Sequence, residues 1–360
     1  MSQEAAVSQR DRNVTTTVKC VVWDLDHTVW DGVLLEDGEV PLRPGIREVI
    51  EELDRRGILQ SIASRNDHDM AVAALTRHGL LDYFLYPQIT WNAKSSSVRA
   101  IAQALNLGLD AFAFVDDDAF ERGEVGFEIP ELLCIDAAEA AGLAERPEFS
   151  PRFITDDSAK RRAMYQADLV RGEFEKEFTG PRDGFLATLG MIFFIASAAE
   201  EDLRRAEELT VRTNQLNTTG YTYSYEELDA FRQSPDHELL VARLEDRHGP
   251  YGTIGLVLIE RGDGAWKIKL LLMSCRVMSR GVGGVLITYL RQRARDAGVR
   301  LLAEYLPNGR NRMMYVTYKF SRFREAARDG DLVHLECDLT DVPPFPSYMT
   351  IQVPDAGERQ

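Results

Sequence analysis

The sequence predicts an α/β fold in two domains, and three observations support this prediction. Over residues 18–140, short apolar runs alternate with amphipathic helical stretches, a pattern that indicates βαβ units and a parallel sheet. Residues 185–350 instead contain several neighbouring apolar runs without intervening helices, which indicates a separate, mixed α/β domain. The chain has 360 residues, more than the roughly 250–300 at which a single core usually stops growing.

The first domain is expected to place polar side chains where its strands end. We expect strands at residues 20–26, 59–64, 111–117 and 131–136, and helices at 45–57, 67–80 and 95–107. In parallel sheets of this kind, ligands bind beyond the carboxyl ends of the strands. Asp24, Ser64 and Asp116 each stand at such an end, so they are the first candidates for a site.

The rest of the chain divides into a tail, a connector and the second domain. Residues 1–17 are polar and are predicted to be a disordered tail, and residues 141–184 are predicted to be a partly helical connector. For the second domain we expect strands at 190–197, 237–246, 252–261, 266–275 and 300–307, and helices at 199–217, 223–233 and 285–298.

Composition narrows the class of protein. No apolar run approaches the ~20 residues needed to cross a bilayer, and we expect a cytoplasmic protein that does not bind membranes. A net charge of −16 argues against nucleic-acid binding, because phosphate backbones are held by basic faces. The four cysteines are far apart and form no CxxC pair, which fits a reducing compartment.

The stretch "VVWDLDHTVWDG" supplies two carboxylates at the end of the first strand. We predict that Asp24 attacks phosphorus as a nucleophile and that Asp26 protonates the leaving oxygen and then activates water. Ser64 and Lys94 would neutralise the phosphoryl oxygens. Mg²⁺ is the predicted cofactor because it takes oxygen ligands, and its predicted ligands are Asp24, Asp26, Asp116 and Asp117.

This ordered set resembles the motifs of the haloacid dehalogenase (HAD) phosphohydrolases, with Asp24, Asp26 and Thr28 forming DxDxT. The resemblance implies a HAD-like parallel sheet with a phosphate-binding set that comprises Thr28, Ser64, Arg65, Asn66 and Lys94. The segment after Thr28 is long enough for a hairpin flap but too short for a cap domain. We therefore expect a site without a large cap.

A second candidate site lies in "LLLMSCRVMSRGVGG". Free N–H groups where a helix begins, together with Arg276 and Arg280, suit a phosphate or pyrophosphate, and the glycine turn with Gly281 and Gly283 resembles the acyl-CoA-binding turn of GNAT acyltransferases. From local chemistry, Cys275 is either a nucleophile activated by the nearby cations or a small residue of the core. Cys20, Cys134 and Cys337 are predicted to be structural.

The whole set of motifs, in order, resembles the FkbH-like glyceryl transferase/phosphatases of polyketide pathways. The motifs that carry this resemblance are "WDLDHTVWDG", "SIASRND", "FVDDDAFERGEV", "RTNQLN", "DRHGPYGTIG" and "LLMSCRVMSRGVG". The resemblance implies a HAD-like domain joined to a GNAT-like domain. It also implies a transfer of D-glycerate from 1,3-bisphosphoglycerate through a thioester on Cys275 to the phosphopantetheine thiol of an acyl carrier protein, with removal of the 3-phosphate.

Several roles stay open at the level of the sequence. His248 is either a base for Cys275 or a packing residue, and the polar group Asn214, Gln215 and Asn217 contacts the glyceryl group or caps a helix end. For docking of the carrier protein we predict a local basic patch that comprises Arg276, Arg280, Arg291, Arg293 and Arg295. The alternatives are a stand-alone phosphatase whose second domain only binds a partner, and an acyltransferase that uses acyl-CoA.

Overall fold

The computed structural model describes residues 17–353, so most of the predicted tail lies outside the described residues. The chain forms two compact units, Met1–Gln166 and Ala167–Gln360, and the division falls inside helix α7 (Arg161–Glu177). In the described part of the chain, no helix is both long and apolar enough to cross a membrane.

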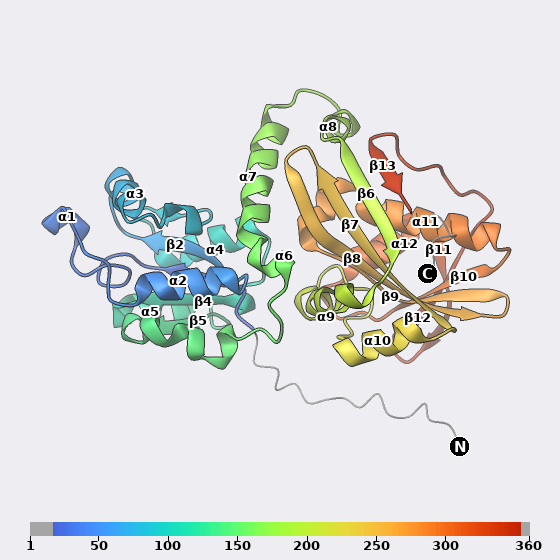
Figure 1. The fold of residues 1–360 in the computed structure, drawn as a ribbon, viewed down its shortest axis with the longest axis horizontal. Helices are drawn as coiled ribbons and strands as arrows, with labels where there is room; N and C mark the ends of the chain where they lie inside the picture. The colour runs from blue at the N-terminus through green and yellow to red at the C-terminus, as the bar shows by residue number, and fades with distance from the viewer. Residues whose placement is uncertain (1–16, 354–360) are drawn as a thin grey trace, which may run out of the picture. The chain divides into compact units, whose positions relative to one another are not determined.

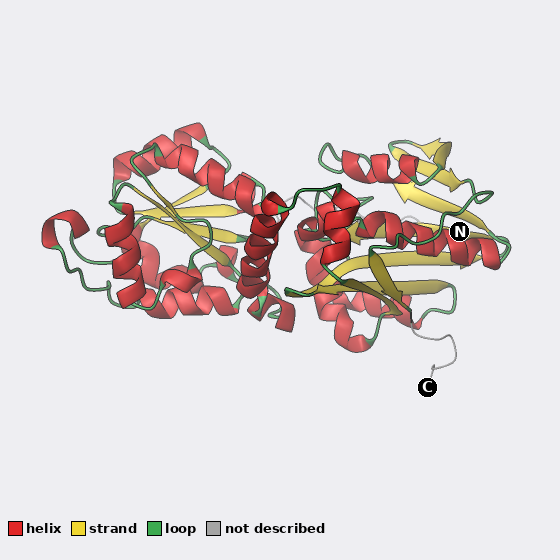
Figure 2. Cartoon of the chain, turned by 90° about the horizontal axis from the view of Figure 1, so that it is seen from above, coloured by secondary structure: helices red, strands yellow, loops and turns green. Residues whose placement is uncertain are grey.

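The first unit is built on a five-stranded parallel sheet with the order β3-β2-β1-β4-β5. Its strands are β1 (Cys20–Trp23), β2 (Leu59–Ser64), β3 (Gln88–Ile89), β4 (Phe112–Asp116) and β5 (Leu133–Asp136). The helices lie on both faces of the sheet (Figure 2). They include α2 (Ile46–Arg55), α3 (His68–Arg77), α4 (Lys94–Leu105) and α5 (Ala119–Glu128).

Burial on both faces explains why the strands of this unit are apolar along their whole length. Every residue of β1, β2 and β4 is buried, as expected for a parallel sheet covered by helices on both sides. The predicted flap is not a hairpin: residues 29–44 contain the short helix α1 (Leu34–Asp37) and only isolated bridges, such as Trp30 with Leu42.

The segment predicted as a connector is largely helical. It contains the end of the 3₁₀ helix η3 (Ala137–Glu145), the 3₁₀ turn η4 (Pro147–Phe149), α6 (Asp156–Ala159), most of α7 and the start of α8 (Arg182–Thr188). Within the first unit, Arg162 forms an ion pair with Asp54 of α2, with 2.9 Å between Nε and Oδ1. The beginning of α7 is therefore fixed to the first unit.

The second unit is built on an eight-stranded mixed sheet with the order β11-β12-β10-β9-β8-β7-β6-β13 (Figure 1). Its strands are β6 (Met191–Ser197), β7 (His237–Asp246), β8 (Gly249–Gly262), β9 (Ala265–Met273), β10 (Arg300–Tyr305), β11 (Phe323–Asp329), β12 (Leu332–Cys337) and β13 (Met349–Gln352). Its remaining helices are α9 (Leu203–Arg212), α10 (Tyr225–Gln233), α11 (Val282–Asp296) and α12 (Arg312–Phe320), with the 3₁₀ helices η5 (Glu200–Asp202) and η6 (Cys275–Arg280).

Alternate residues of the central strands serve two different cores. Leu239 and Val241 of β7 pack with α9 and α10, whereas Leu240 and Ala242 pack in the larger core with α8, α11 and α12. This alternation is the period of a strand, and apolar residues on both faces show that the sheet is covered on both sides.

Between the ends of β9 and β10 the sheet incorporates a third piece of chain. These two strands pair in parallel only as far as Ile268 and Ala303. Beyond that point, Leu216 O accepts a hydrogen bond from Met273 N (2.9 Å), Thr218 N donates to Leu271 O (3.1 Å) and Thr218 O accepts from Leu306 N (3.0 Å). Residues 216–218 therefore fill the space into which the two strands diverge.

Asn311 holds this inserted segment in place. Its side chain is fully buried, its Nδ2 donates to the carbonyl oxygens of Asn217 (3.0 Å) and Leu306 (2.9 Å), and its Oδ1 accepts from the hydroxyl of Tyr305 (3.1 Å). The predicted helix 199–217 correspondingly ends early, at Arg212, because the residues that follow form this insertion.

We predict that Asn311→Ala destabilises the chain by about 2–4 kcal/mol, because buried carbonyl oxygens lose their donor. Urea unfolding measures this change. Asn214→Ala is the matched control, since Asn214 is exposed and its removal should change the free energy of unfolding by less than about 0.5 kcal/mol. Equal midpoints for the two variants would contradict the role given to Asn311.

Candidate functional site

The first candidate site is centred on a buried ammonium group between two carboxylates. Asp24 directly follows β1, Asp116 ends the neighbouring strand β4, and Lys94 is the first residue of α4. Lys94 Nζ lies 2.9 Å from Asp24 Oδ1 and 2.6 Å from Asp116 Oδ2. The exposed fraction is 5% for Asp24, 5% for Lys94 and 0% for Asp116. Parallel pairing of β1 with β4 brings the two acids to one edge of the sheet.

Burial controls the electrostatics of this cluster. It raises the pKa of Asp24 to about 7, with Asp116 adding to the rise and the ammonium of Lys94 opposing it. Burial also acts to lower the pKa of Lys94, but the two carboxylates outweigh it and raise that pKa above its usual value. Lys94 therefore stays protonated, and a cation bound beside the carboxylates would act against the rise in the pKa of Asp24.

The chemistry of this edge of the sheet fits Mg²⁺. One oxygen each from Asp24, Asp116 and Asp117 lie within 4.8 Å of one another, and carboxylate oxygens are the ligands that this hard cation prefers. Thr28, which is fully buried, directs its hydroxyl at Asp117 Oδ1 from 3.5 Å. These three aspartates would hold the ion.

Asp26, predicted to be a fourth ligand, is not part of this group of carboxylates. Its Oδ1 accepts from the indole N–H of Trp30 (2.7 Å) and from Leu34 N (3.1 Å), and its Oδ2 accepts from Asn66 Nδ2 (3.0 Å). The carboxylate is thus oriented by the flap segment rather than by the metal-ligand group. This geometry is compatible with proton transfer by Asp26 and corrects its assignment as a side-chain ligand.

Trp30 is a site residue that the sequence analysis missed. Its side chain is fully buried and its indole N–H is directed at the candidate acid/base. An indole N–H is only a donor, so this contact orients the carboxylate of Asp26 through its oxygen. The spacing of four residues between the two was visible in the sequence, but the flap conformation that brings them together was not.

The predicted phosphate-binding residues differ in their burial and in their polar partners. Ser64 ends β2, next to β1 in the sheet, and only 3% of it is exposed. Arg65 pairs with Glu121, with 2.6 Å between Nη1 and Oε1, and it therefore is not a free cation for phosphate. Asn66 donates to Asp26 and accepts from Asp67 N. Arg65 and Asn66 thus act here on protein groups, which differs from their predicted role.

The second candidate site surrounds Cys275, a half-buried residue that is not in a disulfide and opens the 3₁₀ helix η6. Gly281 follows with φ of +76°, and α11 begins at the next residue. A Cβ at Gly281 would collide with the hydroxyl of Tyr348, and one at Gly283 would approach Met273 Cε to 2.6 Å. The positive φ accounts for a glycine at position 281, whereas at Gly283 the nearest atom is the flexible end of Met273.

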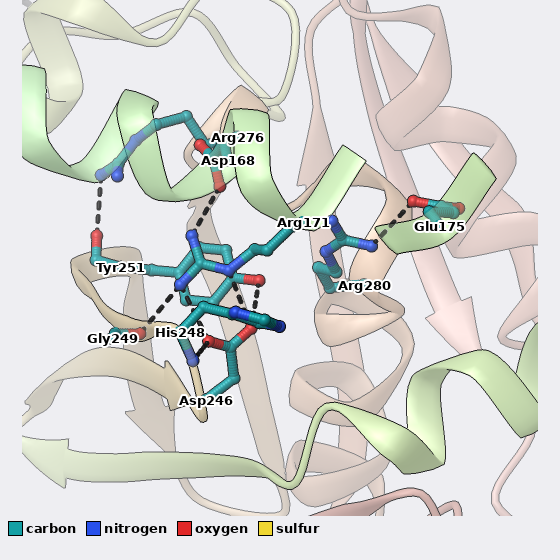
Figure 3. Close-up of polar contacts among 9 residues, drawn as sticks. All are labelled: Asp168, Arg171, Glu175, Asp246, His248, Gly249, Tyr251, Arg276 and Arg280. Carbon is teal, nitrogen blue, oxygen red and sulfur yellow. Dashed lines mark hydrogen bonds and ion pairs between the residues drawn. The ribbon is translucent and has the colours of Figure 1, made fainter. Parts of the chain in front are cut away.

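Next to Cys275 lies a buried ionic network, which Figure 3 shows in close-up. Arg171 of α7 is fully buried and donates twice to Asp246, with distances of 2.8 and 2.9 Å, and once to Asp168 (2.8 Å). The guanidinium also lies 3.9 Å from the ring centroid of Tyr251, whose hydroxyl donates to Asp246 Oδ2 (2.9 Å). Burial acts to raise the pKa of Asp246, but Arg171 outweighs it and lowers that pKa.

This network positions the turn between β7 and β8 beside the cysteine. The Tyr251 carbonyl oxygen, on the first part of β8, accepts from Arg276 Nη2 at 2.7 Å. Because Arg276 directly follows Cys275, the ions around Arg171 restrict the main chain that presents the thiol.

His248 is located in the same turn but packs against an aromatic ring. Its ring centroid lies 5.9 Å from that of Phe174, and its buried Nε2 has no hydrogen-bond partner among residues 17–353. That nitrogen therefore does not contact the thiol as a base would. Of the two roles that the sequence left open for His248, packing is the one the geometry favours.

The five arginines of the predicted docking patch do not form an exposed basic surface. Arg280 is 5% exposed and pairs with Glu175, and Arg291 is 3% exposed. Arg291 donates to the carbonyl oxygens of Asp338 and Asp341. The others are engaged as well: Arg276 with the Tyr251 carbonyl, Arg293 with Glu238 and Arg295 with Asp296. The prediction of this patch is wrong. Helical periodicity shows which residues share a face of α11, but it does not show that residues 338–341 cover Arg291 or that Glu175 pairs with Arg280.

One member of the polar group Asn214, Gln215 and Asn217, which follows α9, has a structural role. Asn217 is fully buried, its Oδ1 accepts from Thr219 N and Gly220 N, and its Nδ2 donates to Tyr221 O. It therefore shapes its own loop, whereas Asn214 and Gln215 are exposed. Of the two roles left open for this group, contact with the glyceryl group or capping of a helix end, neither describes Asn217, which binds backbone groups of residues 219–221.

The other three cysteines are in environments that make their thiols poor nucleophiles. Burial raises the pKa of Cys20, of Cys134 and of Cys337, the last to about 11. A raised pKa lowers the thiolate fraction near neutral pH, which makes these thiols weak nucleophiles.

Comparison with known proteins identifies a family for part of the first unit. Residues 21–120 match the family model for haloacid dehalogenase-like hydrolases, so the first unit carries a domain of this kind. No curated protein matches the chain.

Solved structures each match part of the chain. The N-terminal part of the protein BF1531 from Bacteroides fragilis, containing a phosphatase domain complexed with Mg, is 28% identical over 35% of this chain, with a TM-score of 0.32. This chain covers only 38% of that structure.

Solved structures of acetyltransferases also match part of the chain. The ribosomal-protein-S18-alanine N-acetyltransferase from Escherichia coli is 14% identical over 42% of this chain and 96% of its own, with a TM-score of 0.33. The GNAT domain of S. lividans PAT is 20% identical over 40% of this chain and 89% of its own, also with a TM-score of 0.33.

We predict that Asp24→Asn lowers the rate of phosphate release by about three orders of magnitude or more, because it removes the nucleophile while keeping the side-chain shape. Excess EDTA should stop the wild-type reaction, and added Mg²⁺ should restore it. Release of inorganic phosphate from a phosphate ester measures both effects.

Asp118→Asn is the control for this prediction, since Asp118 caps α5 through the Phe120 amide and the substitution keeps a capping oxygen. It should retain most of the wild-type rate. Undiminished phosphate release by Asp24→Asn would show that another group is the nucleophile.

Proposed function

We propose that this chain is a bifunctional enzyme that transfers the D-glyceryl group of 1,3-bisphosphoglycerate to an acyl carrier protein and removes the 3-phosphate. The observation that carries the proposal is the buried set Asp24, Lys94 and Asp116 in the first unit, together with a half-buried cysteine in the second. The order of motifs that resembles the FkbH-like proteins supports the choice of substrate and partner.

The first step of the acyl transfer uses the thiol. The thiolate of Cys275 attacks the carbonyl carbon of the acyl phosphate, the bond between that carbon and the phosphate oxygen breaks, and inorganic phosphate leaves. The thiol of the carrier's phosphopantetheine then attacks the thioester, and Cys275 departs as a thiolate that regains its proton. Because the acyl phosphate is already activated, neither exchange requires a further energy source.

The 3-phosphate is an unactivated ester, so its removal needs different groups. Asp24 attacks phosphorus, and Asp26 gives a proton to the glyceryl oxygen as the P–O bond breaks. Asp26 then takes a proton from water, which attacks the aspartyl phosphate and regenerates Asp24. Lys94 neutralises charge on the phosphoryl oxygens. Mg²⁺, when bound by the three carboxylates, would add to that neutralisation.

Because thioester formation and ester hydrolysis each release one phosphate, the number of phosphates released per glyceryl group tests the proposal. Wild type should release two phosphates for each glyceryl group loaded, one from the acyl phosphate and one from the ester. We predict that Asp24→Asn releases one and leaves a phosphoglyceryl group, about 80 Da heavier than glyceryl, on the protein. That mass is the mass of the retained phosphate, HPO₃, as expected if only the metal-dependent step is lost.

Cys275→Ala should form no thioester and load no carrier, while it still releases phosphate from a phosphate ester. Intact-protein mass spectrometry of enzyme and carrier, with Mg²⁺ and 1,3-bisphosphoglycerate, measures these outcomes. Cys134→Ala is the matched control, because burial raises the pKa of Cys134 and its removal should leave acylation intact.

Three results would decide against the proposal. Carrier loading that survives Cys275→Ala would show that the acyl group passes directly to the carrier thiol. Phosphate release with unmodified carrier would support the stand-alone phosphatase, and consumption of acetyl-CoA in place of the bisphosphate would support the acyltransferase that uses acyl-CoA.

A further inference from the structure

The outer face of helix α12 is hollowed and carries an unusual set of side chains. A surface hollow of about 320 Å³ is lined by Arg312, Tyr315, Val316, Lys319 and Phe320. These residues are spaced by three or four positions and therefore share one face of the helix. The lining combines two cations with aromatic and aliphatic carbon.

The inner face of the helix fixes the direction of this outer face. Met314 and Tyr318 are fully buried, and Tyr318 lies with its ring centroid 4.8 Å from that of Phe323. On the outer face, Phe320 is 86% exposed and Met313 is 49% exposed. Phe320 adjoins Tyr315 and Val316 in the lining of the hollow, so the three form contiguous apolar surface that a partner would cover.

The charge of this part of the chain is opposite to that of the whole. Residues 310–324 include five Lys or Arg residues and no Asp or Glu, in a chain with a net charge of −16. Arg312 and Lys319 form no ion pair within 4.0 Å in residues 17–353, and Lys319 lies 5.9 Å from the Tyr315 ring. The nearby acid Glu325 accepts from the Tyr315 hydroxyl at 2.7 Å and is also paired with Arg328, and Lys319 helps to lower its pKa. In this they differ from the arginines of the predicted patch, which are engaged by protein groups.

We propose that this face, defined as Arg312, Tyr315, Val316, Lys319 and Phe320, is the docking surface for the acyl carrier protein. This inference rests on the proposed function, since it identifies where the acidic partner of the transfer binds. Carrier proteins present an acidic surface, which the two unpaired cations would attract, and Phe320 with Tyr315 would supply the apolar contact at the centre of the interface.

Two other occupants fit the same observations less well. A nucleic acid would meet repulsion from a chain of net charge −16 beyond this one face. A second copy in a two-fold symmetric dimer would place this face against itself, so that Arg312 and Lys319 oppose like charges. An acidic carrier protein is also repelled by the net charge, but its charge density is lower than that of a nucleic acid, and it does not oppose Arg312 and Lys319 with like charges.

The test measures binding and chemistry separately. An acidic acyl carrier protein, labelled with a fluorophore through its pantetheine thiol, is titrated with the full chain at low ionic strength, and fluorescence anisotropy gives Kd. We expect Arg312→Glu with Lys319→Glu to raise Kd about tenfold or more, and Phe320→Ser alone to raise it several-fold. Kd of the wild type should rise with salt, and the double variant should lose most of that dependence.

The matched control is Arg295→Glu with Arg300→Glu, which changes the net charge equally at exposed positions on other elements. It should bind the carrier with a Kd close to that of the wild type. Acylation of Cys275 by 1,3-bisphosphoglycerate without carrier should be the same in all of these variants, which also shows that each of them folds.

The outcomes separate this inference from the proposed function. Equal Kd values for wild type and the α12 variants, an equal loss in the control, or no binding by wild type would each overturn the docking surface. So would self-association that the α12 variants abolish, since a second copy would then occupy the face. Carrier binding that depends on α12, without acylation of Cys275, would retain the surface and refute the glyceryl chemistry.

Discussion

The ammonium group of Lys94, buried between the carboxylates of Asp24 and Asp116, is the interaction on which the first unit's site depends. An unpaired charge at this depth would be strongly destabilising, so each of the three groups requires the other two. Their meeting depends in turn on the pairing of β1 with β4 and on the start of α4 at Lys94. With Asp117 beside them, these carboxylates place three oxygen ligands within 4.8 Å of one another, an arrangement that suits a divalent ion.

The cluster also shows which parts of a site a sequence can predict. The strands are apolar along their length because both faces are covered, and the acids follow them directly, so Asp24 and Asp116 could be assigned from pattern alone. A lysine alone is a weak signal in a sequence, because lysine is common on surfaces, yet Lys94 lies between the two acids in the structure. Lys94 could be identified from its position in the order of motifs, but not from the residue type alone.

Roles that depend on contacts between distant segments could not be predicted in the same way. Arg65 faces Glu121, fifty-six positions further along the chain, and Arg291 is covered by the carbonyls of residues 338–341. Neither contact has a periodic signal. The last strands, β11 to β13, were also missed, because β11 carries exposed charged residues over most of its length and alternates weakly.

Asn217 and Asn311 also have roles that could not be predicted from the sequence. Both are polar residues in irregular stretches, which is the usual sequence sign of a binding loop, but both are fully buried and serve the main chain between β9 and β10. A buried amide can satisfy several backbone groups at once, and only the path of the strands shows that such groups exist there. A polar residue in a loop therefore indicates a specific role, but the sequence does not show whether that role is to bind a ligand or to support the main chain.

The separation of carboxylate and thiol chemistry also constrains how the proposed substrate is used. An acyl phosphate loses its activation if water attacks it, whereas the ester at the 3-position carries none. A carboxylate site that hydrolysed the acyl phosphate would leave Cys275 without a reactive carbonyl. The proposed function therefore requires that the thiol react before the activated phosphate reaches the carboxylates, or that the carboxylates accept only the ester. Covalent capture on Cys275 meets the first condition, because once the thioester has formed the ester is the only phosphate that remains.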